Sequence, residues 1–391
     1  MIFSKGLRSF ADGYVSLLLP VYLLNLGMSP LDVGVIATTT LLGSGALTLL
    51  VGFHAHRFEH RTLLLMAAAL MAATGLGFAT VTDFWPLLII AFVGTLNPSS
   101  GDVSVFLPLE HAVLSHVVSD SERTSIFARY GLVGALVGAV GALFAGFPEL
   151  LASQMHLDMK AALQGMFVLY ALIGISAALI YSGLPKNPAT EAPRVKAPLD
   201  KSKAMVYKLA ALFSLDAFSG GLILDSMIAL WLYQKFQLSI AVAGTIFLWS
   251  GILAAFSYLV AVRLARRFGL VNTMVFTHLP SSVFLILVPF MPTLGWAIAM
   301  LLARSALSQM DVPTRNSYVM AIVPPEERPA AASMTSVPRS LASSAGPALA
   351  GYLLTVSSFG LPLVVAGSLK ILYDLLLLRT CRHVRPPEEA R

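Results

Sequence analysis

The stretch that decides the fold is GFHAHRFEHR at residues 52–61, because a related stretch, VRLARRFGLV, returns at residues 262–271. An offset of 210 positions aligns Arg57 with Arg267, and each stretch joins two long apolar runs. A short basic loop between apolar runs is typical of the cytoplasmic turn between two membrane-spanning helices. The same turn is therefore predicted to occur once in each half of the chain.

Other identities keep the same order and nearly the same offset along the two halves. They are Gly34 with Gly244, Asp102-Val103 with Asp311-Val312, Glu122-Arg123 with Glu327-Arg328, Gly141 with Gly346, and Ala145-Gly146 with Ala350-Gly351. One such identity carries little weight, whereas their common order indicates an internal repeat. We predict two copies of a six-helix unit, a repeat pattern found in many transporters.

The composition indicates a protein whose main solvent is the lipid bilayer. The chain of 391 residues is 57% hydrophobic and only 12% charged, and its mean hydropathy is +0.79. A soluble domain carries about 25% charged residues, so the composition excludes a water-exposed globular surface. It also excludes a disordered chain, and the single cysteine, Cys381, excludes a disulfide scaffold.

Apolar runs bounded by turn residues predict an all-α polytopic membrane protein with twelve transmembrane helices in two pseudo-symmetric bundles. The expected helices are 7–27, 31–53, 62–81, 84–117, 123–147, 161–184, 205–233, 239–263, 271–292, 294–321, 327–354 and 361–380. The Pro- and Lys-rich segment 185–203 is predicted to be a cytoplasmic linker between an N-terminal bundle, 1–184, and a C-terminal bundle with a short cytoplasmic tail, 204–391.

The distribution of charge predicts the orientation of the chain in the membrane. Lys and Arg gather in the loops on one side, and the other side offers only Lys160 and Lys235. Cytoplasmic loops carry the excess of Lys and Arg, so both termini are placed in the cytoplasm. The same rule accounts for the net charge of +6 without a nucleic-acid partner.

This architecture resembles the major facilitator superfamily, whose loop after the second helix has the form G-x-x-x-D-R-x-G-R-R. Gly52, Arg57 and Arg61 stand in that frame, and His56 occupies the place of the acidic residue. The resemblance implies two bundles that rock about a central site lined by the first, fourth, seventh and tenth helices. It also implies a cytoplasmic gate at this loop and its repeat, with Gly52, His56, Arg57, Arg61 and Arg267 as the expected residues.

Ionisable residues inside the expected spans concentrate on these four helices. Each costs about 2.5–3.5 kcal/mol near the bilayer centre and therefore suggests a function. On helix ten, Arg304, Asp311 and Arg315 lie within about 40° of one another, and their net positive charge suits a carboxylate or phosphate group. The competing interpretation is that Asp311 and Arg315, four positions apart, neutralise each other. Asp216 and Asp225 on helix seven extend the expected substrate site.

Helices four and ten are expected to be broken at equivalent positions of the repeat. Helix four contains NPSSGD at residues 97–102, and helix ten has Pro313 two positions after Asp311. Freed backbone groups are tolerated where they line protein or water, and discontinuous helices point to a transport site. Asn97 is therefore expected at the substrate site, and a packing kink without ligand contact is the alternative.

Proton coupling requires a carboxylate that titrates near neutral pH, and the candidates of the N-terminal half are Asp102, Asp12 and Glu110. Asp102 is the first choice because it lies in the expected break of helix four. For Asp12 the alternative is an ion pair with Arg8, four positions earlier. For Glu110 the alternative is a solvated position near the cytoplasmic end of its helix.

Two further patterns indicate packing rather than transport. Lys370 and Asp374, four positions apart, are expected to form a structural pair. Four glycines of helix five are expected to allow close helix packing: Gly131, Gly134, Gly138 and Gly141.

The sequence therefore predicts a secondary transporter that moves a small anionic or zwitterionic solute by alternating access, coupled to protons. Efflux is slightly favoured over uptake, and a transporter-like sensor or scaffold is the alternative. An enzyme is not expected, since the chain offers no nucleophile with a base, no metal-ligand cluster and no phosphate-gripping loop. We expect a monomer in the plasma (inner) membrane, with no cofactor and no metal.

Overall fold

The computed structural model describes residues 1–54, 58–99, 104–117, 120–185, 199–200, 202–324 and 326–381. Within these ranges all regular structure is helical, and no strand is found there. Nine segments of the described residues are long and apolar enough to cross a bilayer. The prediction of an all-α, multi-pass membrane protein is confirmed.

The helices follow one another along the chain with short connections between most of them. In chain order they are α1 (Ile2–Asn25), α2 (Pro30–His54), α3 (His60–Thr80), α4 (Phe84–Val93), α5 (Phe106–Val117), α6 (Asp120–Phe144), α7 (Phe147–Met155), α8 (Met159–Ser182), α9 (Lys203–Gly221), α10 (Asp225–Phe236), α11 (Ile240–Phe268), α12 (Leu270–Leu287), the 3-10 turn η2 (Val288–Phe290), α13 (Leu294–Ser308), α14 (Asp311–Ile322), α15 (Arg328–Val356) and α16 (Leu361–Cys381).

Three of the expected helices are split in two. Helix four becomes α4 and α5, and helix ten becomes α13 and α14, so both predicted breaks are confirmed. Helix seven is also split, into α9 and α10, after the glycine pair at Gly220 and Gly221, a break that was not predicted. The short helix α7 was not predicted either; Pro148 at its start has the fixed φ that favours the first turn of a new helix.

Contacts divide the chain into two compact units. Unit 1 comprises Met1–Ala192 and Leu224–Leu248, and unit 2 comprises Pro193–Ile223 and Trp249–Arg391. The split of helix seven coincides with a change of unit, because α9 lies in unit 2 and α10 in unit 1. The boundaries 1–184, 185–203 and 204–391 stay a prediction.

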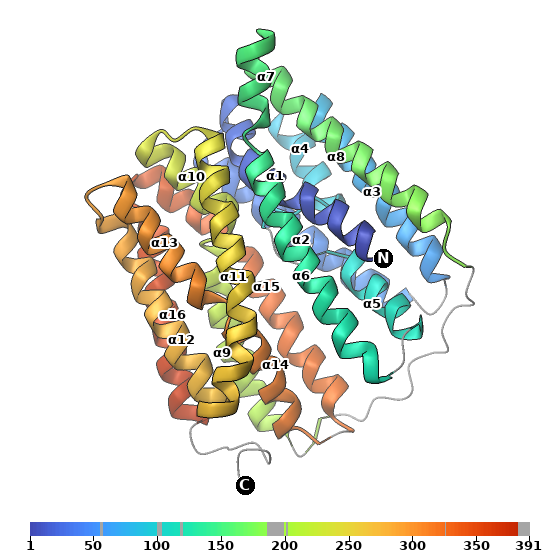
Figure 1. Ribbon diagram of the computed structural model, residues 1–391, viewed down its shortest axis with the longest axis vertical. Coiled ribbons are helices and arrows are strands. Elements are labelled where there is room, and N and C mark those ends of the chain that lie inside the picture. The colour runs from blue at the N-terminus through green and yellow to red at the C-terminus, as the bar shows by residue number, and fades with distance from the viewer. Residues whose placement is uncertain are drawn as a thin grey trace. The chain divides into compact units, whose positions relative to one another are not determined.

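In unit 1, α1 packs along α6 and α3 packs along α8 (Figure 1). Glycine makes the first of these contacts possible. A Cβ added at Gly13 would lie 2.0 Å from the carbonyl oxygen of Gly138, and one at Gly141 would lie 2.1 Å from that of Phe10. Gly131 on the same helix has open space beside it. The close packing predicted for these glycines is thus confirmed at Gly141 but not at Gly131.

Unit 1 also joins α7 to the start of α11. Glu149 on α7 accepts hydrogen bonds from the backbone N–H groups of Ile240, at 2.6 Å, and Ala241, at 3.1 Å. Beside this cap the backbones approach closely, since a Cβ on Gly146 would lie 2.6 Å from Cα of Ala241. A carboxylate at a helix N-terminus satisfies orphan donors and complements the helix dipole.

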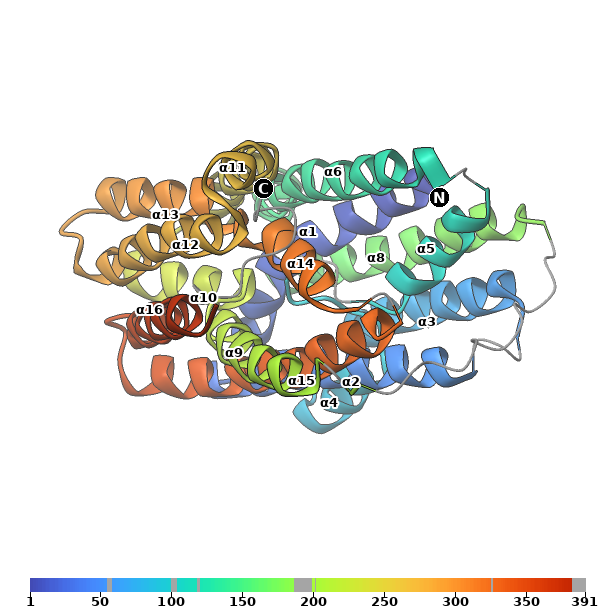
Figure 2. The same ribbon diagram turned by 90° about the horizontal axis from the view of Figure 1, so that it is seen from below.

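In unit 2, α9 packs along α15, and α12 lies between α16 and α13 (Figure 2). A Cβ on Gly346 of α15 would lie 2.3 Å from the carbonyl carbon of Gly221 on α9, so this pair of helices also depends on glycine. A cluster of buried apolar residues, including Phe213, Met274 and Tyr318, fills the space among α9, α12, α14 and α16. The same four helices also carry a group of buried charged residues.

Candidate functional site

Six ionisable side chains meet in the interior of unit 2, and we call them the charge cluster. They are Asp216 on α9, His278 on α12, Asp311 and Arg315 on α14, and Lys370 and Asp374 on α16. Five of these residues are at most 5% exposed, and the side chain of Lys370 is 12% exposed. Buried charges are stable only when paired, so their partners decide what the cluster can do.

Arg315 links two carboxylates of the charge cluster. Its Nη1 lies 2.8 Å from Oδ2 of Asp311, one turn earlier on α14, and 3.3 Å from Oδ2 of Asp216. The ion pair between Asp311 and Arg315 that the competing interpretation expects is therefore present. The contact with Asp216 shows that the pair is not isolated, because the same guanidinium also reaches across to α9.

Lys370 and Asp374 do not form the pair that their spacing suggested. Lys370 Nζ donates to Oδ1 of Asp216 at 2.7 Å, and Asp374 bonds to Nδ1 of His278 at 3.0 Å. The prediction was wrong because the spacing rule considers only pairs of residues on one helix, and it ignores partners on neighbouring helices. In this unit other helices bring closer partners to both residues.

His278 is the member of the charge cluster that was not predicted, since a lone histidine inside an apolar span has no motif. Its Nδ1 faces Asp374, and its Nε2 lies 3.4 Å from Nζ of Lys370 and 3.8 Å from Oδ1 of Asp216. The ring also meets that of Tyr373 edge-on, with centroids 6.0 Å apart. Both nitrogens therefore face ionisable groups.

The break in helix ten explains how Asp311 and Arg315 reach the cluster. α13 ends at Ser308 and α14 begins at Asp311, an acidic residue in the first turn, where the helix dipole favours a negative charge. Arg304 lies on α13, half-buried, and its carbonyl accepts a hydrogen bond from Ser281 at 3.2 Å. The single stripe expected for Arg304, Asp311 and Arg315 assumed a continuous helix, and it is interrupted between Arg304 and Asp311.

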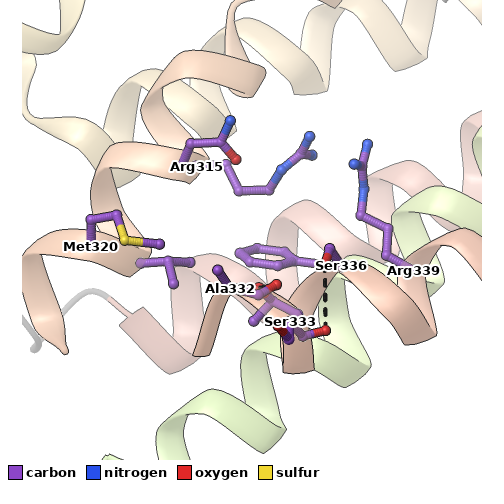
Figure 3. A pocket seen from close by; sticks show the side chains of 10 residues that line it. Arg315, Met320, Ala332, Ser333, Ser336 and Arg339 are labelled. Atoms are coloured by element: carbon purple, nitrogen blue, oxygen red, sulfur yellow. Dashed lines mark hydrogen bonds between the residues drawn. The ribbon is translucent and has the colours of Figure 1, made fainter. Parts of the chain in front are cut away.

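A pocket of about 350 Å³ opens beside the charge cluster, between α9, α14 and α15 (Figure 3). Its lining combines apolar and polar side chains: Phe213, Arg315, Asn316, Val319, Met320, Ala332, Ser333, Thr335, Ser336 and Arg339. Figure 3 shows the guanidinium groups of Arg315 and Arg339 extending toward one another, while Met320 and Ala332 lie farther from them. This volume lies within the range of small-molecule sites.

Hydrogen bonds leave part of the polar lining available to a ligand. Nε of Arg339 is buried and, among the described residues, has no hydrogen-bond partner, and Ser336 donates a long bond of 3.4 Å to the carbonyl of Ser333. Two guanidinium groups, the ring of Phe213 beside Arg315, and Met320 and Ala332 farther away form an amphipathic pocket. Such a pocket can hold an organic anion by a bidentate contact to its charged group.

Unit 1 contains a second buried polar group, centred on Glu110. Its carboxylate binds the guanidinium of Arg8 and accepts hydrogen bonds from the hydroxyls of Tyr130 and Tyr181, the latter at 2.6 Å. Arg8 also lies over the ring of Phe106, 4.1 Å from its centroid. Glu110 is fully buried, so the alternative of a solvated position is wrong.

The break in helix four is stabilised by side chains of neighbouring helices. Beyond the end of α4, the carbonyl of Thr95 accepts a hydrogen bond from Tyr170 at 3.0 Å, and its N–H donates to Thr74 at 3.3 Å. Such partners are needed because backbone groups in a bilayer must be satisfied within the protein. Side chains of α8 and α3 thus fix the backbone at the break of helix four within unit 1.

Asn97 connects this break to α1. Its Oδ1 accepts hydrogen bonds from the N–H of Ser99 at 3.1 Å and from the hydroxyl of Ser99 at 3.0 Å, and its side chain also hydrogen-bonds to Asp12. Asp12 is half-buried, whereas Asn97 is 1% exposed. The structure therefore brings two expected site residues together. Asp102, the first choice for proton coupling, lies outside the described residues.

The remaining expected residues lie apart from the charge cluster. Gly52 is in the last turn of α2, Arg61 is in the first turn of α3, and Arg267 is exposed at the end of α11. His56 and Arg57 fall outside the described residues. Asp225, expected at the substrate site, is half-buried in the first turn of α10 in unit 1.

The decisive comparison is with family models. The model of the Major Facilitator Superfamily matches residues 1–224 and again 209–391. The chain belongs to this superfamily. The family and its structural neighbours are transporters and not enzymes, so this chain is a membrane transporter.

Individual relatives support the fold over nearly the whole chain. An uncharacterized membrane protein of Saccharomyces cerevisiae, YJR124C, is 25% identical over 410 residues, which cover 96% of this chain and 91% of the relative. A bacterial homologue of the human lysosomal transporter Spinster, inward-facing and occupied, matches with a TM-score of 0.77 at 14% identity, covering 97% of this chain and 95% of the other. The human organic anion transporter MFSD10 matches with a TM-score of 0.65 at 18% identity, covering 96% and 97%.

Proposed function

We propose that this transporter moves a small organic anion or zwitterion out of the cell by alternating access, and that protons drive the movement. The plasma (inner) membrane is the proposed location, with both termini in the cytoplasm and the protein acting as a monomer. The bundles 1–184 and 204–391, joined by the linker 185–203, are the proposed moving bodies. The cytoplasmic gate is proposed to consist of Gly52, His56, Arg57, Arg61 and Arg267.

One observation carries the proposed substrate class: Arg315 and Arg339 extend toward one another across a pocket of about 350 Å³. Arg315 is already paired with Asp311 and Asp216, so the argument depends chiefly on Arg339, whose Nε has no hydrogen-bond partner among the described residues. With no carboxylate among the described residues of the lining, this guanidinium favours a ligand with a negative charge. The apolar side chains of Phe213, Val319 and Met320 favour an organic body over a small inorganic ion. The likeness to a human organic anion transporter agrees with this chemistry.

Other residues expected at the substrate site extend the proposal beyond the pocket. Asp216 and Asp311 hold Arg315 in place, so they are proposed to position the residue that contacts the anion. Arg304, Asn97 and Asp225 are proposed to contact substrate elsewhere along its path. Each belongs to one of the interrupted helices, which is where transport sites form in this class of protein.

For proton coupling in the N-terminal half we retain Asp102 and Asp12 as the proposed carriers. Asp12 is half-buried and hydrogen-bonded to Asn97, at the edge of the helix-four break. Glu110 was the third candidate, and its contacts favour another role. Arg8 and two tyrosine hydroxyls bind its carboxylate, so we propose that Glu110 chiefly holds α1, α5, α6 and α8 together.

A thermal-shift experiment tests the proposed substrate class on purified protein. The probe is benzenesulfonate, which has an aromatic body and a permanent negative charge; benzenesulfonamide is its neutral control. A ligand that binds only the folded state raises apparent stability, so we expect benzenesulfonate alone to raise the melting temperature, by about 2–4 °C. Arg339→Gln should abolish the shift, whereas Arg379→Gln, which replaces an arginine outside the pocket in the same unit, should not.

Equal shifts with the sulfonate and the sulfonamide would contradict the proposed anion site. So would a shift that survives Arg339→Gln. Binding without any movement of the probe across the membrane in reconstituted protein would instead support the alternative, a sensor or scaffold that uses the transporter fold.

A further inference from the structure

The charge cluster of unit 2 contains three carboxylates and only two permanent cations. The carboxylates belong to Asp216, Asp311 and Asp374, and the cations to Arg315 and Lys370. With a neutral His278 the cluster carries one negative charge, and with a protonated His278 it carries none. All six residues lie in the protein interior, where a net charge is costly. Arg339 interacts electrostatically with Asp216 and Asp311 from α15, outside these six residues. Among the six themselves, the charge balance depends on the proton of His278.

The geometry provides different partners for the two forms of His278. Nδ1 lies 3.0 Å from Oδ1 of Asp374, and because an ionised carboxylate can only accept, Nδ1 carries a proton in both forms. In the neutral form, the lone pair of Nε2 faces Nζ of Lys370 at 3.4 Å. In the protonated form, Nε2–H turns to Oδ1 of Asp216, which lies 3.8 Å away in this structure. The proton thus changes how strongly Asp216 interacts with Lys370 and His278.

Asp216 is also where the proton site meets the pocket. Its Oδ1 faces Lys370 and His278, and its Oδ2 faces Arg315 at 3.3 Å. Arg315 in turn lines the pocket opposite Arg339. A chain of direct contacts therefore runs from the pocket through Arg315 and Asp216 to His278.

We propose that His278 and Asp374 form a proton-binding site that is coupled to anion binding in the pocket through Asp216 and Arg315. The proposal rests on the proposed anion site and extends it to a coupling residue that lies outside the N-terminal candidates. An anion that binds Arg315 competes with Asp216 for its guanidinium and adds negative charge beside the cluster. Both effects favour a protonated His278, so anion and proton bind with positive cooperativity. An inward proton gradient then drives uptake of the anion together with the proton, so this inference keeps the proposed anion site but not the proposed outward direction.

Other ionisable groups around His278 do not replace it in this role. Lys370, Tyr373 and Asp374 face it from α16, and Asp216 faces it from α9. From α13, Arg304 contributes its carbonyl to Ser281, one turn from His278. From α14, Arg315 and Asp311 reach it through Asp216. Histidine is the side chain of this set whose ordinary titration falls between pH 5 and 8.

Calorimetric titration of the purified protein with benzenesulfonate tests this linkage. The titration is run at about pH 6 and about pH 8, the range in which histidine titrates, and in two buffers of different ionisation enthalpy. The sulfonate does not titrate, so any proton taken up enters the protein. Because linkage is reciprocal, we expect net proton uptake on binding and an affinity about 10-fold higher at the lower pH.

His278→Gln should still bind benzenesulfonate but take up no proton, and its affinity should no longer depend on pH. Asp374→Asn provides a second variant and should reduce the uptake. His156→Asn removes an exposed histidine of unit 1 and should behave like the unmodified protein.

The outcomes separate this inference from the proposed function. Binding without proton uptake in the unmodified protein, or equal uptake in His278→Gln, would overturn the coupling role of His278 and leave the anion site standing. Absence of any benzenesulfonate binding would overturn the anion site and this inference with it.

Discussion

Lys370 Nζ lies 2.7 Å from Oδ1 of Asp216, a residue 154 positions earlier in the chain. The contact joins α16 to α9 inside unit 2. Asp374, which does not pair with Lys370, instead interacts with His278. Lys370→Met should destabilise the protein by about 3 kcal/mol, because removing one partner of a buried ion pair leaves the other uncompensated. Unfolding in denaturant, followed by tryptophan fluorescence, measures the change.

The matched variant for this pair is the double replacement Lys370→Met with Asp216→Asn. It removes both charges and should recover more than half of the lost stability. If the single variant is as stable as the unmodified protein, the pair does not contribute to folding as we describe.

Glycine is required where α1 and α6 touch. Gly141→Ala should cost about 1–3 kcal/mol, since the new Cβ would meet the carbonyl oxygen of Phe10 and force the helices apart. Gly131→Ala, on the same helix but beside open space, should change stability by less than about 0.5 kcal/mol. Thermal unfolding of the two variants side by side gives the comparison, and equal losses would contradict close packing of α1 on α6 at Gly141.

The cap formed by Glu149 should also be measurable. Glu149→Gln replaces charge-assisted hydrogen bonds to the N–H groups of Ile240 and Ala241 with weaker ones, and we expect a loss of about 1 kcal/mol. Glu59→Gln is the control, because Glu59 precedes α3 without a side-chain cap bond. Hydrogen exchange at the first turn of α11 should accelerate only in Glu149→Gln; unchanged exchange would show that the cap contributes little.

Glu110 offers a test of structural against coupling roles in unit 1. Glu110→Gln leaves the buried guanidinium of Arg8 without its carboxylate, so we expect a loss of about 3 kcal/mol in stability. The double variant Arg8→Met with Glu110→Gln should recover part of it. Recovery of stability together with normal proton-driven transport would support a structural role. Recovery of stability with loss of proton drive would assign coupling to Glu110.

Much of the architecture could be predicted from the sequence, because membrane spans and their sides depend on local hydropathy and charge. The breaks in helices four and ten were also predictable, from Pro98 and Pro313 and their neighbours. The break after Gly221 has a similar signal in its glycine pair, but no proline accompanies the pair, so the sequence does not distinguish it from an ordinary packing site.

The charge cluster was harder to predict, because its contacts join residues of four different helices. Spacing along one helix correctly paired Asp311 with Arg315. The same rule failed for Lys370 and Asp374, whose partners lie on α9 and α12. His278 had no sequence signal, since its importance comes only from the carboxylates that the fold places beside it.

The most direct test of the central claim is transport of radiolabelled benzenesulfonate in proteoliposomes under an imposed pH gradient. We predict transport well above that of empty liposomes, accelerated by a pH gradient of one orientation and slowed when the gradient is reversed. Transport should fall to below about a tenth in Arg339→Gln but not in Arg379→Gln. Exchange no faster than in empty liposomes, or an Arg339→Gln variant that transports at the unmodified rate, would contradict the claim.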